Sequence, residues 1–245
     1  MKTKVILSTA ILAVISTLAY SQVSGPSIET SFQNYIRASS GSVNSGSVLP
    51  NFVIKENTRG NRYLYENWVD GFVVGTDGNT YNSPRYKYNY DKISRKLFML
   101  YDSATVIELS SGDIAGFTLK NAQGDLVFER LKNSTDLNFY QAVYKEEKGY
   151  SLYKLLTTKY NKADYQTNGI IESGKKYDEY VDTEEYFILS PKQEITKIVF
   201  KKKSIEKALE NESANVQEYY SKNKGGIVDQ EYVKQLLQYI NTVKS

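Results

Sequence analysis

A series of short apolar segments, broken at regular intervals by Gly, Asn and Asp, constrains the fold of this chain more than any other feature. From about residue 52 to 200 the segments are rich in Tyr, Val, Ile, Phe and Thr, which favour strands. In chain order they are NRYLYENWV, GFVVGT, RYKYNYD, RKLFMLYD, ATVIELS, DIAGFTLK, DLVFERL, NFYQAVYK, GYSLYKLLTTKY, YDEYVDTEEYFIL and EITKIVF. About eleven strands at this spacing predict a mainly β fold, an antiparallel meander that closes into a barrel or a sandwich.

Two local signals refine this prediction. Thr76-Asp77-Gly78-Asn79 is the strongest turn, because Asp-Gly supplies the positive φ of a tight hairpin. Gly116 interrupts DIAGFTLK, and the apolar phase shifts across it, which indicates a β-bulge.

Residues 201–245 change to a helical period and predict two or three helices packed on the β body. Ser204, Ser213 and Asp229 are expected to cap them. The last helix has one apolar stripe, formed by Val233, Leu236, Leu237 and Ile240. Such a stripe usually covers the protein's own core, and partner or membrane binding is the alternative use.

The N-terminus predicts export. Residues 1–21 combine two lysines, a short apolar run and small residues before a cleavage point between Ser21 and Gln22, which is typical of a signal peptide. Residues 22–50 have the composition of a flexible segment ending in a linker, and residues 51–200 form the predicted β body. The mature protein is expected in the periplasm or outside the cell, with no later segment that is apolar enough to span a bilayer.

The chain contains no cysteine and no histidine. This composition excludes disulfides, thiol nucleophiles, zinc sites of the usual nitrogen or sulfur kind and Ser-His-Asp catalysis. Removal of residues 1–21 lowers the 31 basic residues to 29 against 28 acids, which does not favour nucleic-acid binding. Phosphate-loop, dinucleotide and GxSxG patterns are missing, so we expect no cofactor.

The aromatic stretch Asn61–Asp91 is the first place to look for a ligand site. In RYKYNYD the tyrosines alternate with polar residues, so one face of the strand is aromatic. Packing in the core is the common role of such a face, and a platform for a sugar or an apolar ligand is the alternative. The candidate ligand-binding residues are Trp68, which lies beside a predicted turn, and the tyrosines Tyr63, Tyr65 and Tyr86.

Paired acids are the remaining route to catalysis. Glu184-Glu185, Glu146-Glu147 and Asp178-Glu179 are neighbours in sequence, so within a strand their side chains would point to opposite faces. A glycosidase needs two carboxyls that converge on one bond. The sequence therefore leans against an enzyme, with no catalytic residue predicted and no metal site.

The order of segments YLYENWVDGFVVGTDG, YKYNYD, KLFML, VIELSSGDIAGFTLKN, KKYDEYVDTEEYFI and SIEKALENESANVQEYYSKNK, after a leader ending in Ser-Gln, resembles a broad group of uncharacterised exported proteins of Bacteroidetes. The resemblance implies export and a β-rich body with a helical tail, and it implies no activity. Asp102-Ser103-Ala104 resembles the O-glycosylation acceptor motif of such proteins, with Ser103 as the acceptor. A plain hairpin turn is the alternative interpretation.

These observations predict an exported, non-catalytic binding module of the cell envelope or the exterior, whose partner is a small ligand or an envelope protein. A carrier of a lipid-like molecule in a β cavity and a carbohydrate hydrolase with two carboxylates are the alternatives.

Overall fold

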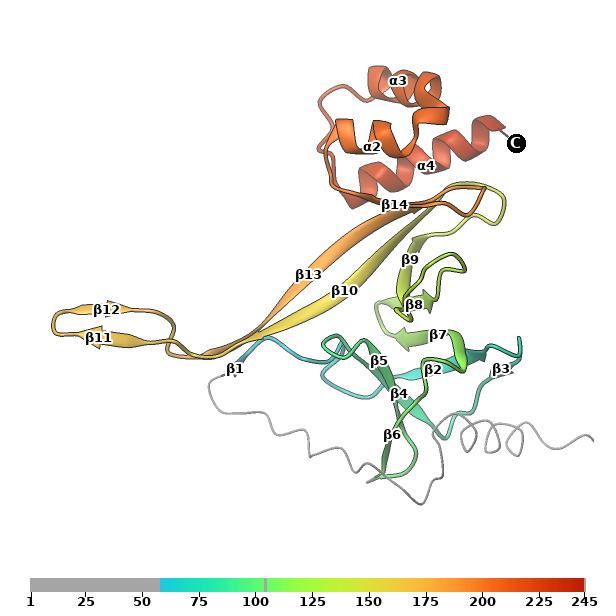
Figure 1. The fold of residues 1–245 in the computed structure, drawn as a ribbon. Coiled ribbons are helices and arrows are strands. Elements are labelled where there is room, and N and C mark those ends of the chain that lie inside the picture. The colour runs from blue at the N-terminus through green and yellow to red at the C-terminus, as the bar shows by residue number, and fades with distance from the viewer. Residues whose placement is uncertain (1–57, 104, 245) are drawn as a thin grey trace, which may run out of the picture.

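Strands make up most of the regular structure, and the fold is mainly β with three α-helices at the C-terminal end (Figure 1). The computed structural model describes residues 58–103 and 105–244. The predicted signal peptide, its cleavage point at Ser21 and Gln22, and the predicted segment 22–50 lie outside the described residues.

Nine strands form one large sheet with the order β1-β13-β10-β9-β8-β7-β2-β3, and β14 also pairs with β13. Their bounds are β1 Thr58–Arg59, β2 Asp70–Gly75, β3 Thr80–Tyr81, β7 Ile114–Asn121, β8 Gly124–Glu129, β9 Tyr140–Tyr144, β10 Ser151–Asn161, β13 Asp178–Leu189 and β14 Ile195–Ile198. Every pair is antiparallel except β1 with β13. The antiparallel meander expected from the sequence is therefore the main arrangement. The one parallel pair joins β1 to a strand more than a hundred residues further along the chain, which local patterns do not report.

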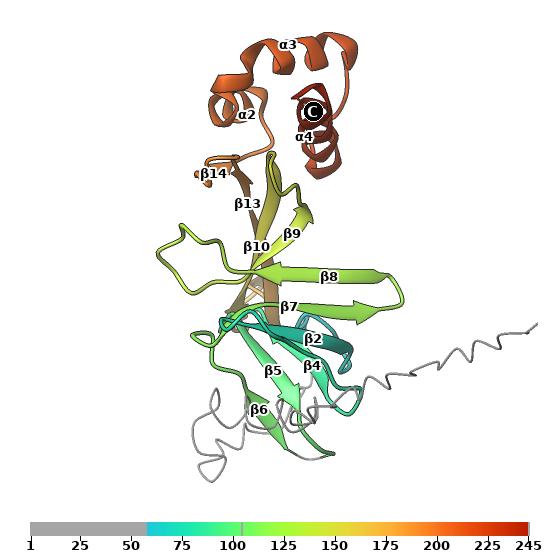
Figure 2. The same cartoon turned by 90° about the vertical axis from the view of Figure 1, so that its right-hand side faces the viewer.

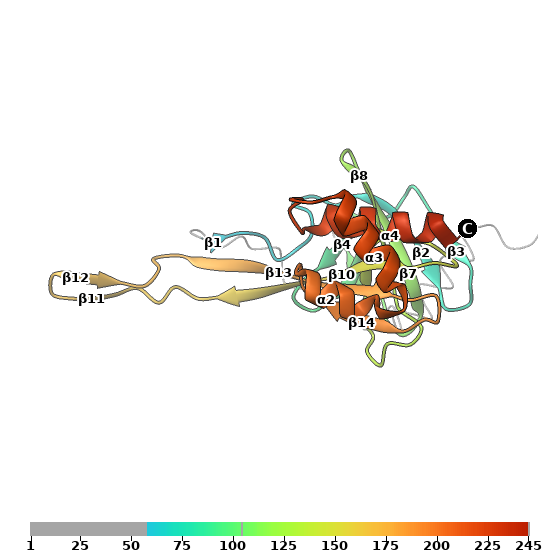
Figure 3. The ribbon, with the colours of Figure 1, turned by 90° about the horizontal axis from the view of Figure 1, so that it is seen from above.

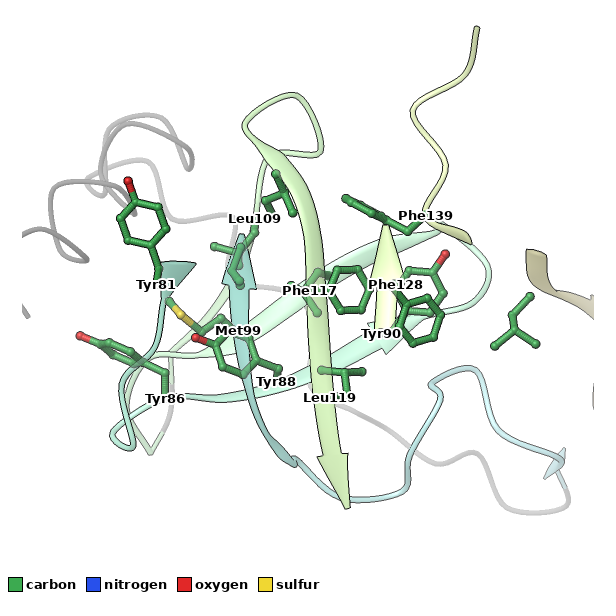
Figure 4. Close-up of a cluster of buried hydrophobic side chains, with 14 residues drawn as sticks. Tyr81, Tyr86, Tyr88, Tyr90, Met99, Leu109, Phe117, Leu119, Phe128 and Phe139 are labelled. Carbon is green, nitrogen blue, oxygen red and sulfur yellow. The ribbon is translucent and has the colours of Figure 1, made fainter. Parts of the chain in front are cut away.

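A second sheet of three strands faces one end of the large sheet. It consists of β4 Lys87–Asp91, β5 Lys96–Leu100 and β6 Val106–Glu108. Between the two sheets lies a core that includes Tyr88, Tyr90 and Met99 from the small sheet and Phe117 and Phe128 from the large one (Figure 4). The described sheets remain open, so of the two predicted closures they fit a sandwich and not a barrel.

The bulge predicted at Gly116 is present, one residue earlier. Val74 pairs with Gly116 and Gly75 pairs with Ile114, so Ala115 is the extra residue in β7. A Cβ at Gly116 would lie 2.7 Å from the carbonyl oxygen of Phe128, which explains why glycine occupies this position. The turn predicted at 76–79 is also confirmed, with Gly78 at φ +82.

The helices pack on the opposite end of the large sheet. They are α2 Lys202–Ala208, α3 Ser213–Lys222 and α4 Gln230–Lys244, with a 3-10 turn at Glu210–Glu212. The predicted stripe of α4 is fully buried and contacts Leu152 of β10 and Ile188 of β13 in one cluster. Among the described residues, none of the helices has the length and apolar character that a membrane crossing requires.

One of the three predicted helix caps is confirmed. Asp229 accepts the backbone N–H of Tyr232 at 2.9 Å and so caps α4. Ser204 and Ser213 do not cap, which corrects the prediction, because α2 begins before Ser204 and α3 begins at Ser213 itself. The Ser204 hydroxyl instead accepts the N–H of Val199, at the end of the preceding strand.

Strands β10 and β13 join the two ends of the molecule. Leu152 lies in the helical cluster and Leu156, four residues on, lies in the sandwich core. Lys92, in the β4–β5 turn, places its buried ammonium 2.7 and 2.8 Å from the two carboxylate oxygens of Asp182, which fixes the small sheet to β13. Figure 2 shows the helices above and the sandwich below, connected by these two strands.

Candidate functional site

The stretch Asn61–Val69, which was predicted to be a strand, contains no strand in the structure. Two isolated bridges pair its backbone with β4, between Tyr63 and Asp91 and between Val69 and Tyr88. Its polar and glycine-flanked sequence permits an irregular path, because its backbone groups find partners elsewhere. The Asn89 amide, for example, donates to the Tyr65 carbonyl at 2.8 Å, and its oxygen accepts the Tyr65 N–H at 3.2 Å.

The four predicted ligand-binding residues do not form one surface. Tyr86 is fully buried, like Tyr88 and Tyr90, so the aromatic face of this strand is core, as its alternation favours. Tyr63 and Tyr65 are half-buried. Tyr65 packs against the sandwich core, and the Tyr63 ring meets Phe98 edge-on at 6.3 Å. Tyr86 is therefore a packing residue.

Trp68 is half-buried between the exposed Asn67 and the half-buried Val69, and the role predicted for it stays a prediction. Asp70, two residues later, lines an open hollow of about 550 Å³ whose other lining residues are Gly71, Asn82, Ser83, Pro84, Lys120, Asn121 and Ala122. Asp70 is also paired with Lys87 at 2.5 Å. The lining is polar and open to solvent, which does not favour the lipid-carrier alternative.

The neighbouring acids of β13 are paired with lysines on different strands. Glu184 accepts from Lys154 of β10 at 2.9 Å, and Glu185 accepts from Lys197 of β14 at 2.5 Å. Adjacent residues of a strand point to opposite faces, so these two carboxylates do not converge on one bond. The part of the chain that the structure describes contains no cluster of three acids that could hold a metal ion.

The feature that the sequence prediction missed is an arm. Beyond the sandwich, β10 and β13 continue as a two-stranded ribbon that ends in a hairpin of β11 Gln166–Asn168 and β12 Ile171–Ser173 (Figures 1 and 3). Gly169 and Ile170 form the turn, because Asn168 pairs with Ile171, and Gly169 has φ +66. Glycine at the first of two turn positions is a hairpin signal, and it could have revealed this hairpin.

Two isoleucines occupy the tip of this arm. Ile170 is 101% exposed and Ile171 is 72% exposed, while the rest of β11 and β12 is polar. An isoleucine side chain gains about 1.5–3 kcal/mol when it is fully buried, so leaving two neighbouring ones in water is unfavourable. The arm tip, which we define as residues 166–173, is therefore the most marked apolar projection among the described residues.

The base of the arm carries tyrosine and arginine. The Arg59 guanidinium lies 3.7 Å from the centroid of the Tyr177 ring, and the rings of Tyr160 and Tyr180 lie 5.1 Å apart. Tyr160 donates its hydroxyl to Asp178, and this hydrogen bond raises the pKa of Tyr160 to about 12. Tyrosine and arginine are the residues most enriched at protein–protein hot spots.

Ser103 is exposed on the turn between β5 and β6, where an O-glycosylation enzyme could reach it. Asp102 accepts the N–H of Thr105 at 2.8 Å, so the alternative interpretation as a hairpin turn is also supported.

Comparison with protein-family models, with curated proteins and with solved structures found no match.

Proposed function

We propose that this protein is an exported, non-catalytic module that binds a protein partner through its arm, in the periplasm or outside the cell. The observation that carries the proposal is the tip of the arm, where two adjacent isoleucines project into solvent from a ribbon two strands wide. A narrow apolar tip fits a concave apolar site on another protein better than a flat surface.

Two features support a protein partner over a lipid surface. The tip carries neither Trp nor Phe, and Glu172 stands beside the isoleucines, whereas residues that anchor at a membrane interface are mostly aromatic or basic. The base of the arm offers Arg59 and Tyr177, which belong to the residue types typical of protein interfaces. The composition of residues 1–21 and the resemblance to exported Bacteroidetes proteins support export.

Site-specific photo-crosslinking tests the proposal. A photoreactive residue at position 170, in the full chain produced in its own cells, is expected to form one dominant adduct with a protein. The same residue at Ile227, which is 81% exposed in the loop before α4, is the matched control and should form none. Adducts with lipid alone, or equal adducts at both positions, would refute the assignment.

A further inference from the structure

The outer edge of β13 contains a gap. On the side away from β10, β1 pairs with Asp178 and Glu179, and β14 pairs with residues 186–189. Between them, no strand of the described residues pairs with the five residues Val181–Glu185 on this side, and the first four of these five are exposed (Figure 1). Five residues of strand span about 16 Å.

The register shows which backbone groups face this gap. Thr158 donates its N–H to the Lys92 carbonyl at 3.2 Å, on the side of β10 away from β13, and Thr158 stands opposite Asp182. In an antiparallel pair, two opposite residues that do not bond to each other both turn N–H and C=O outward. Asp182 therefore presents both groups to the gap, and by alternation so does Glu184.

Two independent contacts confirm this alternation. A Cβ at Gly60 would lie 2.5 Å from the carbonyl oxygen of Tyr180, so that carbonyl faces β1. Ser190 donates its N–H to the carbonyl of Glu194, on the side of β14. The backbone N–H and C=O groups of even-numbered residues thus face the outer edge along the whole strand. No backbone hydrogen bond within the described residues satisfies the outward groups of Asp182 and Glu184.

The acidic side chains beside the gap do not prevent a strand from pairing there. Acidic side chains on an edge strand commonly prevent another strand from pairing. Here each acid already has a cation: Asp182 has Lys92, Glu184 has Lys154 and Glu185 has Lys197. Val181, 41% exposed, and Val199, 54% exposed just after β14, add apolar surface near its two ends.

A second copy of this chain does not fit by the same edge. Its β13 would carry its own β1 and β14, and an antiparallel approach centred on Thr183 would place the β1 of one copy at the level of the β14 of the other. A single extended segment does not have this obstacle.

We propose that the Val181–Glu185 edge is a docking site for one extended segment of a partner protein. The segment adds a short strand between β1 and β14 and forms up to four hydrogen bonds with Asp182 and Glu184, as in strand addition to an exposed sheet edge. Apolar side chains at alternate positions of the segment would contact Val181 and Val199. This site is separate from the arm tip and does not depend on it.

Amide hydrogen exchange on the full chain tests the site before any partner is known. We expect the N–H groups of Asp182 and Glu184 to exchange at least tenfold faster than that of Thr183, which faces β10. Slow exchange at all three positions would show that the gap is already filled and would overturn the proposal.

Crosslinking then tests the occupant. A photoreactive residue at Val181 should capture a protein through an extended segment, identified by peptide mapping. A synthetic peptide of that segment is the probe: it should slow exchange at Asp182 and Glu184 at least tenfold and leave Thr183 unchanged. Val181→Lys should weaken its binding at least tenfold. Val243→Lys, at a 55% exposed valine of α4, should not change it.

Capture of lipid only, or a peptide that binds without protecting Asp182 and Glu184, would overturn the proposal. Ile170→Ser separates this site from the arm: it should leave binding of the peptide unchanged, so failure at one site does not imply failure at the other.

Discussion

At the scale of single residues, tyrosine hydroxyls form many of the polar side-chain contacts of this histidine-free chain. Of its 22 tyrosines, several donate a hydroxyl to a carboxylate, including Tyr153 to Glu129 and Tyr186 to Glu184. Burial and the hydrogen bond to Glu129 raise the pKa of Tyr153, so its hydroxyl stays a donor at any physiological pH. Tyr90 differs, because its buried hydroxyl has no hydrogen-bond partner among the described residues.

We expect the same substitution to change the free energy of unfolding differently at the two tyrosines. Tyr153→Phe should lower the free energy of unfolding by about 1–3 kcal/mol, because it removes a hydrogen bond to a charged group. Tyr90→Phe should be neutral or stabilising, because it removes a hydroxyl that is desolvated without a partner. Urea denaturation of both variants measures the difference, and an equal loss in both would contradict the assignment of these hydroxyls.

Asp91 makes the stability of the fold depend on pH. Burial alone would raise its pKa, but hydrogen bonds from Arg62, Ser94 and the Ile93 N–H outweigh burial and hold the pKa below its ordinary value. The unfolded pKa is about 3.9, so this contribution is complete above about pH 4 and is lost as the pH falls through the lower folded value.

Asp91→Asn is therefore expected to cost about 3 kcal/mol at pH 7, because it leaves a buried site built for a carboxylate without its charge. The difference between the variant and the parent should shrink as the pH falls below 4. Denaturation curves at pH 7 and pH 3 test this expectation, and a difference that grows on acidification would show that Asp91 is not the ionised partner of Arg62.

At the scale of elements, Asn241 fastens α4 to the sheet. Its side chain accepts the N–H of Tyr150 and donates to the carbonyl of the same residue, both at 2.9 Å, next to the start of β10. A Cβ at Gly149 would lie 2.4 Å from the Asn241 oxygen, so glycine makes room for this contact. The helix thus binds the strand through one amide as well as through its apolar stripe.

Asn241→Ala is expected to lower the free energy of unfolding by about 2–4 kcal/mol, because two buried backbone groups of Tyr150 lose their partner. Gln238→Ala, on the exposed face of the same helix, should have almost no effect. Thermal unfolding compares the two, and similar melting temperatures would show that the amide does not hold the helix.

Elements with a strong local pattern could be predicted, and those that depend on distant contacts could not. The alternation in KYNYD correctly places its tyrosines in the core, although Asn89 and Asp91 on the other face are buried too. The stripe of α4 identifies the buried face of that helix correctly, because that face is set by a fixed period. The parallel pairing of β1 and the gap beside Val181 depend on residues far apart in sequence, for which the sequence carries no local signal. The arm tip is an intermediate case, since Gly169 indicates its turn but not its projection.

At the scale of the whole molecule, β10 contributes Leu156 to the sandwich core and Leu152 to the helical cluster. Its partner β13 contributes Ile188 to the helical cluster and holds Lys92 of the small sheet through Asp182. The two strands pair without interruption over their common length. They therefore cannot unfold at one end of the molecule without unfolding at the other. We therefore expect both ends to unfold together.

Two probes report the two ends separately. Trp68, the only tryptophan, precedes β2 in the sandwich, and the helical circular dichroism signal reports α2 to α4. Their urea unfolding curves should coincide. A helical signal that disappears at lower urea than the tryptophan signal would mean that the helices form an independently stable unit.

The central claim is that the arm tip binds a protein partner. Its most direct test is the affinity of the crosslinked partner, once purified, for the full chain and for the Ile170→Ser/Ile171→Ser double variant. Two buried isoleucines contribute about 3–6 kcal/mol, so the double variant should bind at least about 100-fold more weakly, while Ile227→Ser should bind like the parent. Equal affinity of the double variant and the parent would contradict the claim.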